Sequence, residues 1–184
     1  IHNFGAGPAV LPLSVVQAVG DALPNLMDSG FGLCEISHRS GTFQSVVDSA
    51  MERVRRVLSV PDDYTVLFLQ GGASLQFYMT PLNILQDGQQ ADYLITGGWA
   101  KKALKEAGRV GDVIAIWDDS ENGFKSVPSD GDYTVRENAV YVHYTSNNTL
   151  YGTQYHHLPD CGGRPRILDA SSDIAGVPID VGAH

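Results

Sequence analysis

Apolar residues recur along this chain at two spacings, one typical of helices and one of buried strands. At Pro12–Met27 and Phe43–Val60 they return every third or fourth position, which predicts two amphipathic helices. Short apolar runs further on predict strands at Val66–Leu69, Ala91–Thr96, Val113–Trp117, Ala139–Thr145 and Arg166–Ala170. Helices are expected between them at Leu75–Leu85 and Trp99–Ala107. This alternation predicts an α/β fold, with a mostly parallel sheet flanked by helices.

The stretch from Tyr64 to Phe77, YTVLFLQGGASLQF, carries the first chemical signal. An apolar run stops at Gly71 and Gly72, and Ser74 follows where a helix would expose its first free N–H groups. Such a helix N-terminus favours an anion and predicts a phosphorylated ligand. A Gly-Gly turn that is merely tight remains an alternative. The stretch has neither a P-loop lysine nor the GxGxxG spacing of a dinucleotide site.

Composition and charge exclude several classes of protein. The 184 residues are 43% hydrophobic, enough for one sizeable core, and 18% are charged. The net charge of -9 argues against nucleic acid or an anionic membrane surface as partner. Two cysteines are too few for a disulfide framework or a four-cysteine zinc site, and we expect no metal. With no signal peptide and no membrane-spanning run, we expect a soluble, cytoplasmic protein.

Three polar or aromatic residues lie at or just after the carboxyl ends of predicted strands, where parallel sheets bind ligands. Asp169 ends the run PRILD and suits either a helix cap or the ring nitrogen of a pyridine cofactor. Trp99 follows a Gly-Gly turn and suits either the core or the face of a ring. Thr149 lies in SNNTLYG, where such residues also form ordinary turns. In the loop SHRSG, Arg39 beside His38 is either a solvated cation or a clamp for a carboxylate or phosphate.

The order of these segments resembles one known family. The matching motifs run collinearly from Asn3 to Val181: NFGAGPAVLP, EISHRSGTF, LFLQGGASLQF, PLNIL, ADYLITGGWAKKALKEA, YVHYTSNNTLYGTQ and LDASSDIAGVPIDV. In these the chain resembles the phosphoserine aminotransferases, class-V enzymes that use pyridoxal 5'-phosphate. The resemblance implies the large cofactor-binding domain of the aspartate-aminotransferase superfamily (fold type I), truncated. It implies a segment 1–14 that reaches the active site and a partial large domain at 15–184.

The resemblance also implies a role for each residue of the cofactor site. Ala73 and Ser74 would hold the cofactor phosphate through backbone and hydroxyl donors. Trp99 would stack on the pyridine ring, and Thr149 would bond near the ring hydroxyl. Asp169 would pair with the ring nitrogen, as the strand-end position already suggests.

The implied substrate residues lie near the N-terminus. Arg39 would bind the acid groups of the substrate with His38 beside it, and the loop at Ala6 would close over the substrate. Some family members have an arginine at the position of Ser74. The Schiff-base lysine of the family is expected past His184, so we expect this chain to be part of a longer protein and inactive alone.

The activity implied for the intact enzyme is amino transfer in L-serine biosynthesis. Glutamate and 3-phosphohydroxypyruvate would give 2-oxoglutarate and O-phospho-L-serine, and the family implies a homodimer. Alternatives are another fold type I aminotransferase, such as an alanine–glyoxylate aminotransferase or a cysteine desulfurase, and a binding module that holds a phosphate ligand without chemistry. A nucleotide-binding α/β domain is a further alternative, which predicts nucleotide binding at the Gly71-Gly72 turn.

Overall fold

A computed structural model describes residues 2–184 of the chain. It divides into two compact units, which we call unit 1 (Ile1–Leu67) and unit 2 (Phe68–His184). Among the described residues, no helix combines the length and the apolar character needed to cross a bilayer.

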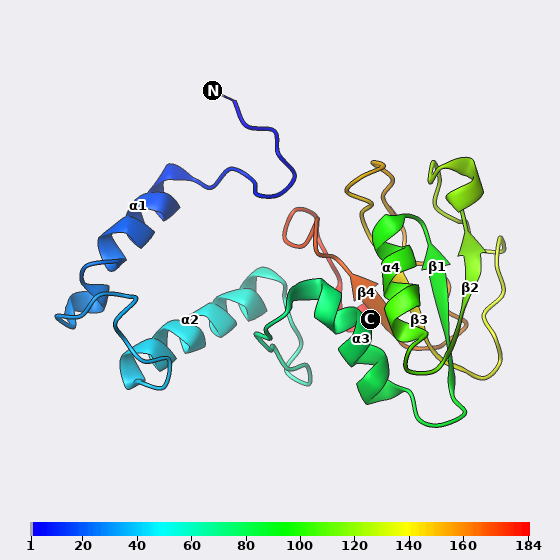
Figure 1. The fold of residues 1–184 in the computed structure, drawn as a ribbon, viewed down its shortest axis with the longest axis horizontal. Coiled ribbons are helices and arrows are strands. Elements are labelled where there is room, and N and C mark those ends of the chain that lie inside the picture. Colours follow the sequence, from blue (N-terminus) through cyan, green and yellow to red (C-terminus); the bar gives the residue numbers. More distant parts are fainter. Residues whose placement is uncertain (1) are drawn as a thin grey trace. The chain divides into compact units, whose positions relative to one another are not determined.

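Unit 1 is helical, as the apolar periodicity predicts. It contains α1 (Leu13–Ala22), a 3-10 turn η1 (Leu26–Asp28) and α2 (Gly41–Val57), drawn in blue and cyan in Figure 1. The helix predicted to reach Met27 ends early because Pro24 has no N–H and its ring obstructs the helical path.

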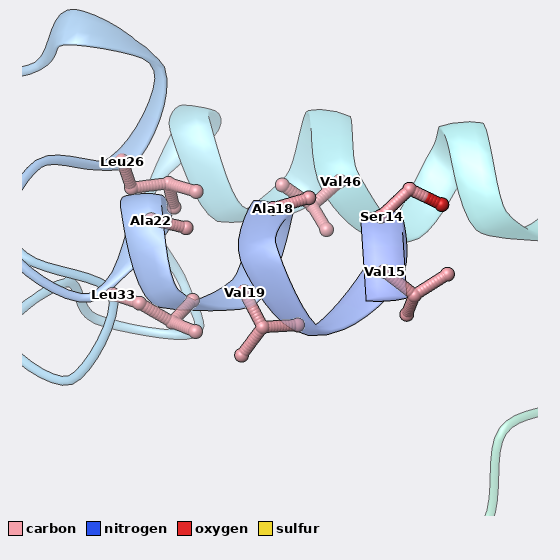
Figure 2. Close-up of a pocket in the computed structure, with 8 residues that line it drawn as sticks. All are labelled: Ser14, Val15, Ala18, Val19, Ala22, Leu26, Leu33 and Val46. Atoms are coloured by element: carbon pink, nitrogen blue, oxygen red, sulfur yellow. The ribbon is translucent and has the colours of Figure 1, made fainter. Parts of the chain in front are cut away.

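An apolar groove lies along α1 in unit 1 (Figure 2). Its volume is about 410 Å³, and side chains from α1, from the loop after it and from α2 line it. The lining residues are Ser14, Val15, Ala18, Val19, Ala22, Leu26, Leu33 and Val46.

Unit 2 is built on a parallel sheet of the order β2-β1-β3-β4. Its strands are β1 (Gln90–Ile95), β2 (Asp112–Asp118), β3 (Ala139–Thr145) and β4 (Arg166–Asp169). Its helical segments are α3 (Gly72–Ile84), α4 (Gly98–Ala107), η2 (Ser120–Asn122) and η3 (Val181–Ala183). The α/β fold and its parallel sheet are therefore confirmed, and these four strands lie within a residue of their predicted ends.

The strand predicted at Val66–Leu69 is wrong, because the segment has neither helical nor strand structure. Its side chains are largely exposed, with Leu67 at 66%. A strand needs a neighbour for its N–H and C=O groups, and no described segment pairs with this one. An apolar run indicates that a segment prefers burial, but it does not show whether a neighbouring strand is present to pair with it.

Both faces of the sheet in unit 2 are packed: successive side chains of a strand point to opposite sides, and other elements cover each side. Tyr93 and Tyr141 lie on one face, where they pack with alanines of α4 and share a hydrogen bond of 2.7 Å between hydroxyls. Leu94 and Val142 lie on the other, against the loops that follow β2 and β3. Both clusters hold fully buried side chains, so the sheet is the rigid platform of the chain.

Candidate functional site

The candidate residues of unit 2 gather at the carboxyl edge of the sheet. All the strands are parallel, so the segments that follow β1, β3 and β4 emerge at the same edge. These segments are Thr96–Trp99, Ser146–Thr149 and Ala170–Asp173. Trp99 and Thr149 lie in these segments, and Asp169 is the last residue of β4 itself.

The helix α3 begins at this site with a left-handed glycine. Gly71 has φ +90°, and a Cβ there would overlap the side chain of Leu75, so only glycine fits. The N–H of Leu75 donates to the Gly71 carbonyl at 3.3 Å and closes the first helical turn. The N–H groups of Ala73 and Ser74 precede that bond and have no partner within the helix. These donors and the helix dipole suit an anion.

A lysine of α4 reaches the start of α3. Nζ of Lys102 donates to Oγ of Ser74 at 2.8 Å. The same ammonium lies 5.2 Å from the ring centroid of Trp99, one helical turn earlier on α4. Trp99 is 40% exposed, so much of its ring remains accessible. The arrangement brings a cation, a hydroxyl and an aromatic ring together.

The loop that follows β3 is fixed by Asn148, which is buried. Its side-chain amide donates to the Thr96 carbonyl at the end of β1 and to Oγ1 of Thr153 at 3.2 Å. A Cβ on Gly97 would overlap this amide, so the close approach of the two loops requires glycine there. Thr149, the next residue, is exposed at the head of the turn. We call these two hydrogen bonds of the Asn148 amide the Asn148 clamp. The Asn148 clamp fixes the backbone of the turn that carries Thr149.

Asp169 ends β4 with one carboxylate oxygen engaged and one open. Oδ1 accepts hydrogen bonds from the Ser171 N–H at 3.1 Å and from the Ser171 hydroxyl. No described residue donates to Oδ2. The Asp169 carbonyl also accepts from the Ser146 N–H at 3.0 Å, which ties the ends of β3 and β4 together. The carboxylate is thus oriented and keeps an acceptor for a further donor.

His143 lies in β3 beneath this edge and is buried. Its ring stacks on Tyr93 with centroids 4.8 Å apart and meets Phe77 edge-on. Burial lowers the pKa of His143 to about 4, against the opposing influence of the Asp169 charge. The imidazole is therefore neutral at pH 7.

Several buried polar atoms at this edge have no partner among the described residues. They are Oγ1 of Thr96, Oγ1 of Thr145, Nδ1 of His143 and Oδ1 of Asn148. Buried polar atoms normally have partners, so their grouping at the ends of β1 and β3 indicates a site that a polar ligand or water completes. The donors around Ser74 suit an anionic group of that ligand, and the open oxygen of Asp169 suits an N–H donor.

The family model for class-V aminotransferases matches residues 1–183. The chain belongs to the class-V aminotransferase family. It spans about half the length of the curated relatives it matches.

Those relatives of this class-V aminotransferase chain are phosphoserine aminotransferases. The chain is 46% identical to that of Desulfotalea psychrophila and 47% identical to that of Desulfatibacillum aliphaticivorans. Each match covers 98% of this chain and 50% of the relative.

Solved phosphoserine aminotransferases share its fold. The structure from Bacillus circulans subsp. alkalophilus aligns with a TM-score of 0.92 at 41% identity, covering 98% of this chain and 50% of that one. A structure with bound pyridoxal phosphate, from Trichomonas vaginalis, aligns with a TM-score of 0.90 at 35% identity, covering 97% and 53%.

The structure brings part of the predicted site together. The five residues predicted to hold the cofactor all lie in unit 2, at the start of α3, after β1 and β3, or at the end of β4: Ala73, Ser74, Trp99, Thr149 and Asp169. The predicted substrate residues Ala6, His38 and Arg39 lie in unit 1 and are exposed. The roles of both groups remain predictions.

Sequence reasoning missed three residues of this edge. Lys102 lies three positions after Trp99, a helical spacing that puts both on one face of α4. His143 precedes Thr145 by two, so strand alternation puts both on one face of the sheet. Asn148 adjoins Thr149, but its clamp spans two loops, and no local pattern shows it.

Proposed function

We propose that the complete protein containing this chain is a pyridoxal-phosphate-dependent phosphoserine aminotransferase. It would transfer the amino group of glutamate to 3-phosphohydroxypyruvate, giving O-phospho-L-serine and 2-oxoglutarate. The observation that carries the proposal is the 46% identity to a phosphoserine aminotransferase over 98% of this chain. The family resemblance also supports a cytoplasmic homodimer.

The residues at the sheet edge fit pyridoxal phosphate. The free N–H groups of Ala73 and Ser74, with the Ser74 hydroxyl, would hold its phosphate. The exposed face of Trp99 would stack on its ring, and Thr149 would bond near the ring hydroxyl. Oδ2 of Asp169, which no described residue occupies, would accept a hydrogen bond from the protonated ring nitrogen of the cofactor. Bound in this way, the cofactor supplies an electron sink for bonds at the amino-acid Cα.

Asp169 is the residue of this chain closest to that chemistry. Its carboxylate would hold a proton on the ring nitrogen, and the bonds from Ser171 fix the orientation of the carboxylate. Partial burial strengthens this interaction because the local dielectric is low. The neutral ring of His143 adds no competing positive charge beneath it.

The substrate residues would come from unit 1. Arg39 lies in a turn that ends at Ser40, whose Oγ accepts from the Phe43 N–H at 3.2 Å and caps α2. No described carboxylate pairs with the Arg39 guanidinium. It therefore retains the forked donors that bind a carboxylate or phosphate, with His38 beside it and the Ala6 segment as cover.

An assay of amino transfer tests the proposal. The complete protein, loaded with pyridoxal phosphate, is incubated with O-phospho-L-serine and 2-oxoglutarate, and glutamate is measured. Alanine with glyoxylate, cysteine desulfuration and plain phosphate-ligand binding are tested in parallel. We expect glutamate formation with phosphoserine; activity with alanine or cysteine alone, or binding without turnover, would overturn the proposal.

A pair of matched variants tests the role of Asp169. Asp169→Asn should lower kcat by roughly 10²-fold or more, because an amide cannot stabilise the protonated ring nitrogen as a carboxylate does. Asp118→Asn is the control, since Asp118 also ends a strand but lies on β2, at the far side of the sheet from β4. Equal activity of the two variants would remove Asp169 from the mechanism.

A further inference from the structure

We propose that Lys102 is a cofactor-binding residue, which orients the Ser74 hydroxyl and places a positive charge beside the cofactor phosphate. The inference rests on the proposed function and extends it to a residue to which the family resemblance assigns no role. Lys102 would therefore make the site prefer pyridoxal phosphate over pyridoxal, which lacks the phosphate.

The hydrogen bond between Lys102 and Ser74 has only one possible direction. The ammonium of Lys102 has three donors and no acceptor, so Oγ of Ser74 must be the acceptor of the 2.8 Å bond. The hydroxyl proton of Ser74 is then turned away from Lys102. Ser74 donates to no described residue, so that proton is available to a ligand oxygen.

Lys102 also carries a positive charge that no carboxylate in the described part of the chain neutralises. Lys102 forms no salt bridge among the described residues, whereas Arg136 pairs with Asp92 and Arg109 with Glu106. The chain as a whole carries a net charge of -9, so an anionic ligand needs a cation nearby to offset that field. Lys102 supplies one next to the free N–H groups at the start of α3.

The Lys102 side chain is held in place by its neighbours. The half-buried side chain lies above the Trp99 ring, which holds the ammonium on the α3 side of α4. An unrestrained lysine side chain samples many rotamers and loses this freedom when it binds an anion. Here the ring and the Ser74 hydroxyl restrict it before any ligand arrives, which lowers the entropy cost of binding a phosphate.

The test compares cofactors with and without the phosphate. Dissociation constants for pyridoxal phosphate and for pyridoxal are measured on the complete apo-protein, for the parent and for Lys102→Met. We expect pyridoxal phosphate to bind about 10- to 100-fold more weakly to the variant, the range for a lost hydrogen bond to a charged group. Pyridoxal binding should stay within about twofold, and the salt dependence of pyridoxal phosphate binding should become shallower.

Lys101→Met is the matched control, because it removes the same charge from an exposed neighbouring position on α4. It should leave both constants unchanged. Equal weakening of both ligands by Lys102→Met would show a structural role alone, and no weakening of either would show no role; both overturn the inference. If the parent itself binds no pyridoxal phosphate, the proposed function fails first and the inference falls with it.

Discussion

The two units of this chain use apolar residues in opposite ways. In unit 1, neither α1 nor α2 has a single buried side chain, and Leu13 is 70% exposed. In unit 2, β1 and β3 are almost wholly buried, with Tyr93 at 1%. Both units have clear apolar periodicity, yet only the sheet forms a closed core from described residues.

The difference shows what periodicity does and does not determine. An apolar stripe indicates which face of an element avoids water. The apolar faces of the sheet are covered by α3, α4 and the loops of unit 2. The stripe of α1 borders an open groove instead (Figure 2). An extended exposed apolar surface of this kind is typical of an interface with further protein. Stability should therefore depend on unit 2, and solubility on unit 1.

The largest expected effect comes from the buried ion pair of the sheet. Asp92 is 0% exposed and accepts from Nε of Arg136 at 2.6 Å and from its N–H at 2.7 Å. Asp92→Asn should lower the free energy of unfolding by about 3 kcal/mol, since it leaves the guanidinium only the longer, exposed pair with Asp112 at 3.5 Å. Urea unfolding measures this. Glu106→Gln, which breaks the outward-facing pair with Arg109, should cost under about 1 kcal/mol.

Two adjacent glycines give the next effect. Gly97→Ala should destabilise unit 2 by about 1–3 kcal/mol and weaken cofactor binding, because the new methyl group overlaps the Asn148 amide. Gly98→Ala is the control, since its Cβ would lie 3.9 Å from Leu150 and Tyr151, an ordinary contact. Thermal unfolding and cofactor titration compare them. Equal stability and equal cofactor affinity of the two variants would contradict a role for the Asn148 clamp.

The buried histidine predicts a pH dependence. The pKa of His143 is about 4 in the folded protein and about 6.5 unfolded, so below pH 6.5 the unfolded state binds the additional proton. Its contribution to stability is complete above pH 6.5 and is lost as the pH falls towards 4. The loss at pH 5 should be about 2 kcal/mol. Urea unfolding at several pH values should show this slope, and His143→Gln should remove it; an unchanged slope would contradict it.

The smallest effect is expected in unit 1. Val19→Ala on α1, where Val19 is 52% exposed, should change the free energy of unfolding by less than about 0.5 kcal/mol and reduce binding of a hydrophobic dye. The same change at the fully buried Val142 should cost about 2 kcal/mol. Similar costs at the two positions would break the contrast between the units.

Sequence reasoning succeeded where the structure follows from local pattern. The apolar runs of β1 and β3 predict those strands, and the predicted site residues Trp99 and Asp169 lie near the carboxyl ends of strands as expected, while their roles remain predictions. It failed at Val66–Leu69, where the apolar run is present but a pairing strand is not. It missed Lys102, since its bond to Ser74 joins two helices 28 positions apart in sequence.

The most direct test is a crystal structure of the complete protein with pyridoxal phosphate, in which two distances are measured. The ring nitrogen should lie about 2.7–3.2 Å from the Asp169 carboxylate, and a phosphate oxygen should lie at the same range from the Ser74 hydroxyl. A cofactor bound with its phosphate away from the start of α3, or with its ring nitrogen away from β4, would contradict the assignment of this edge as the cofactor site.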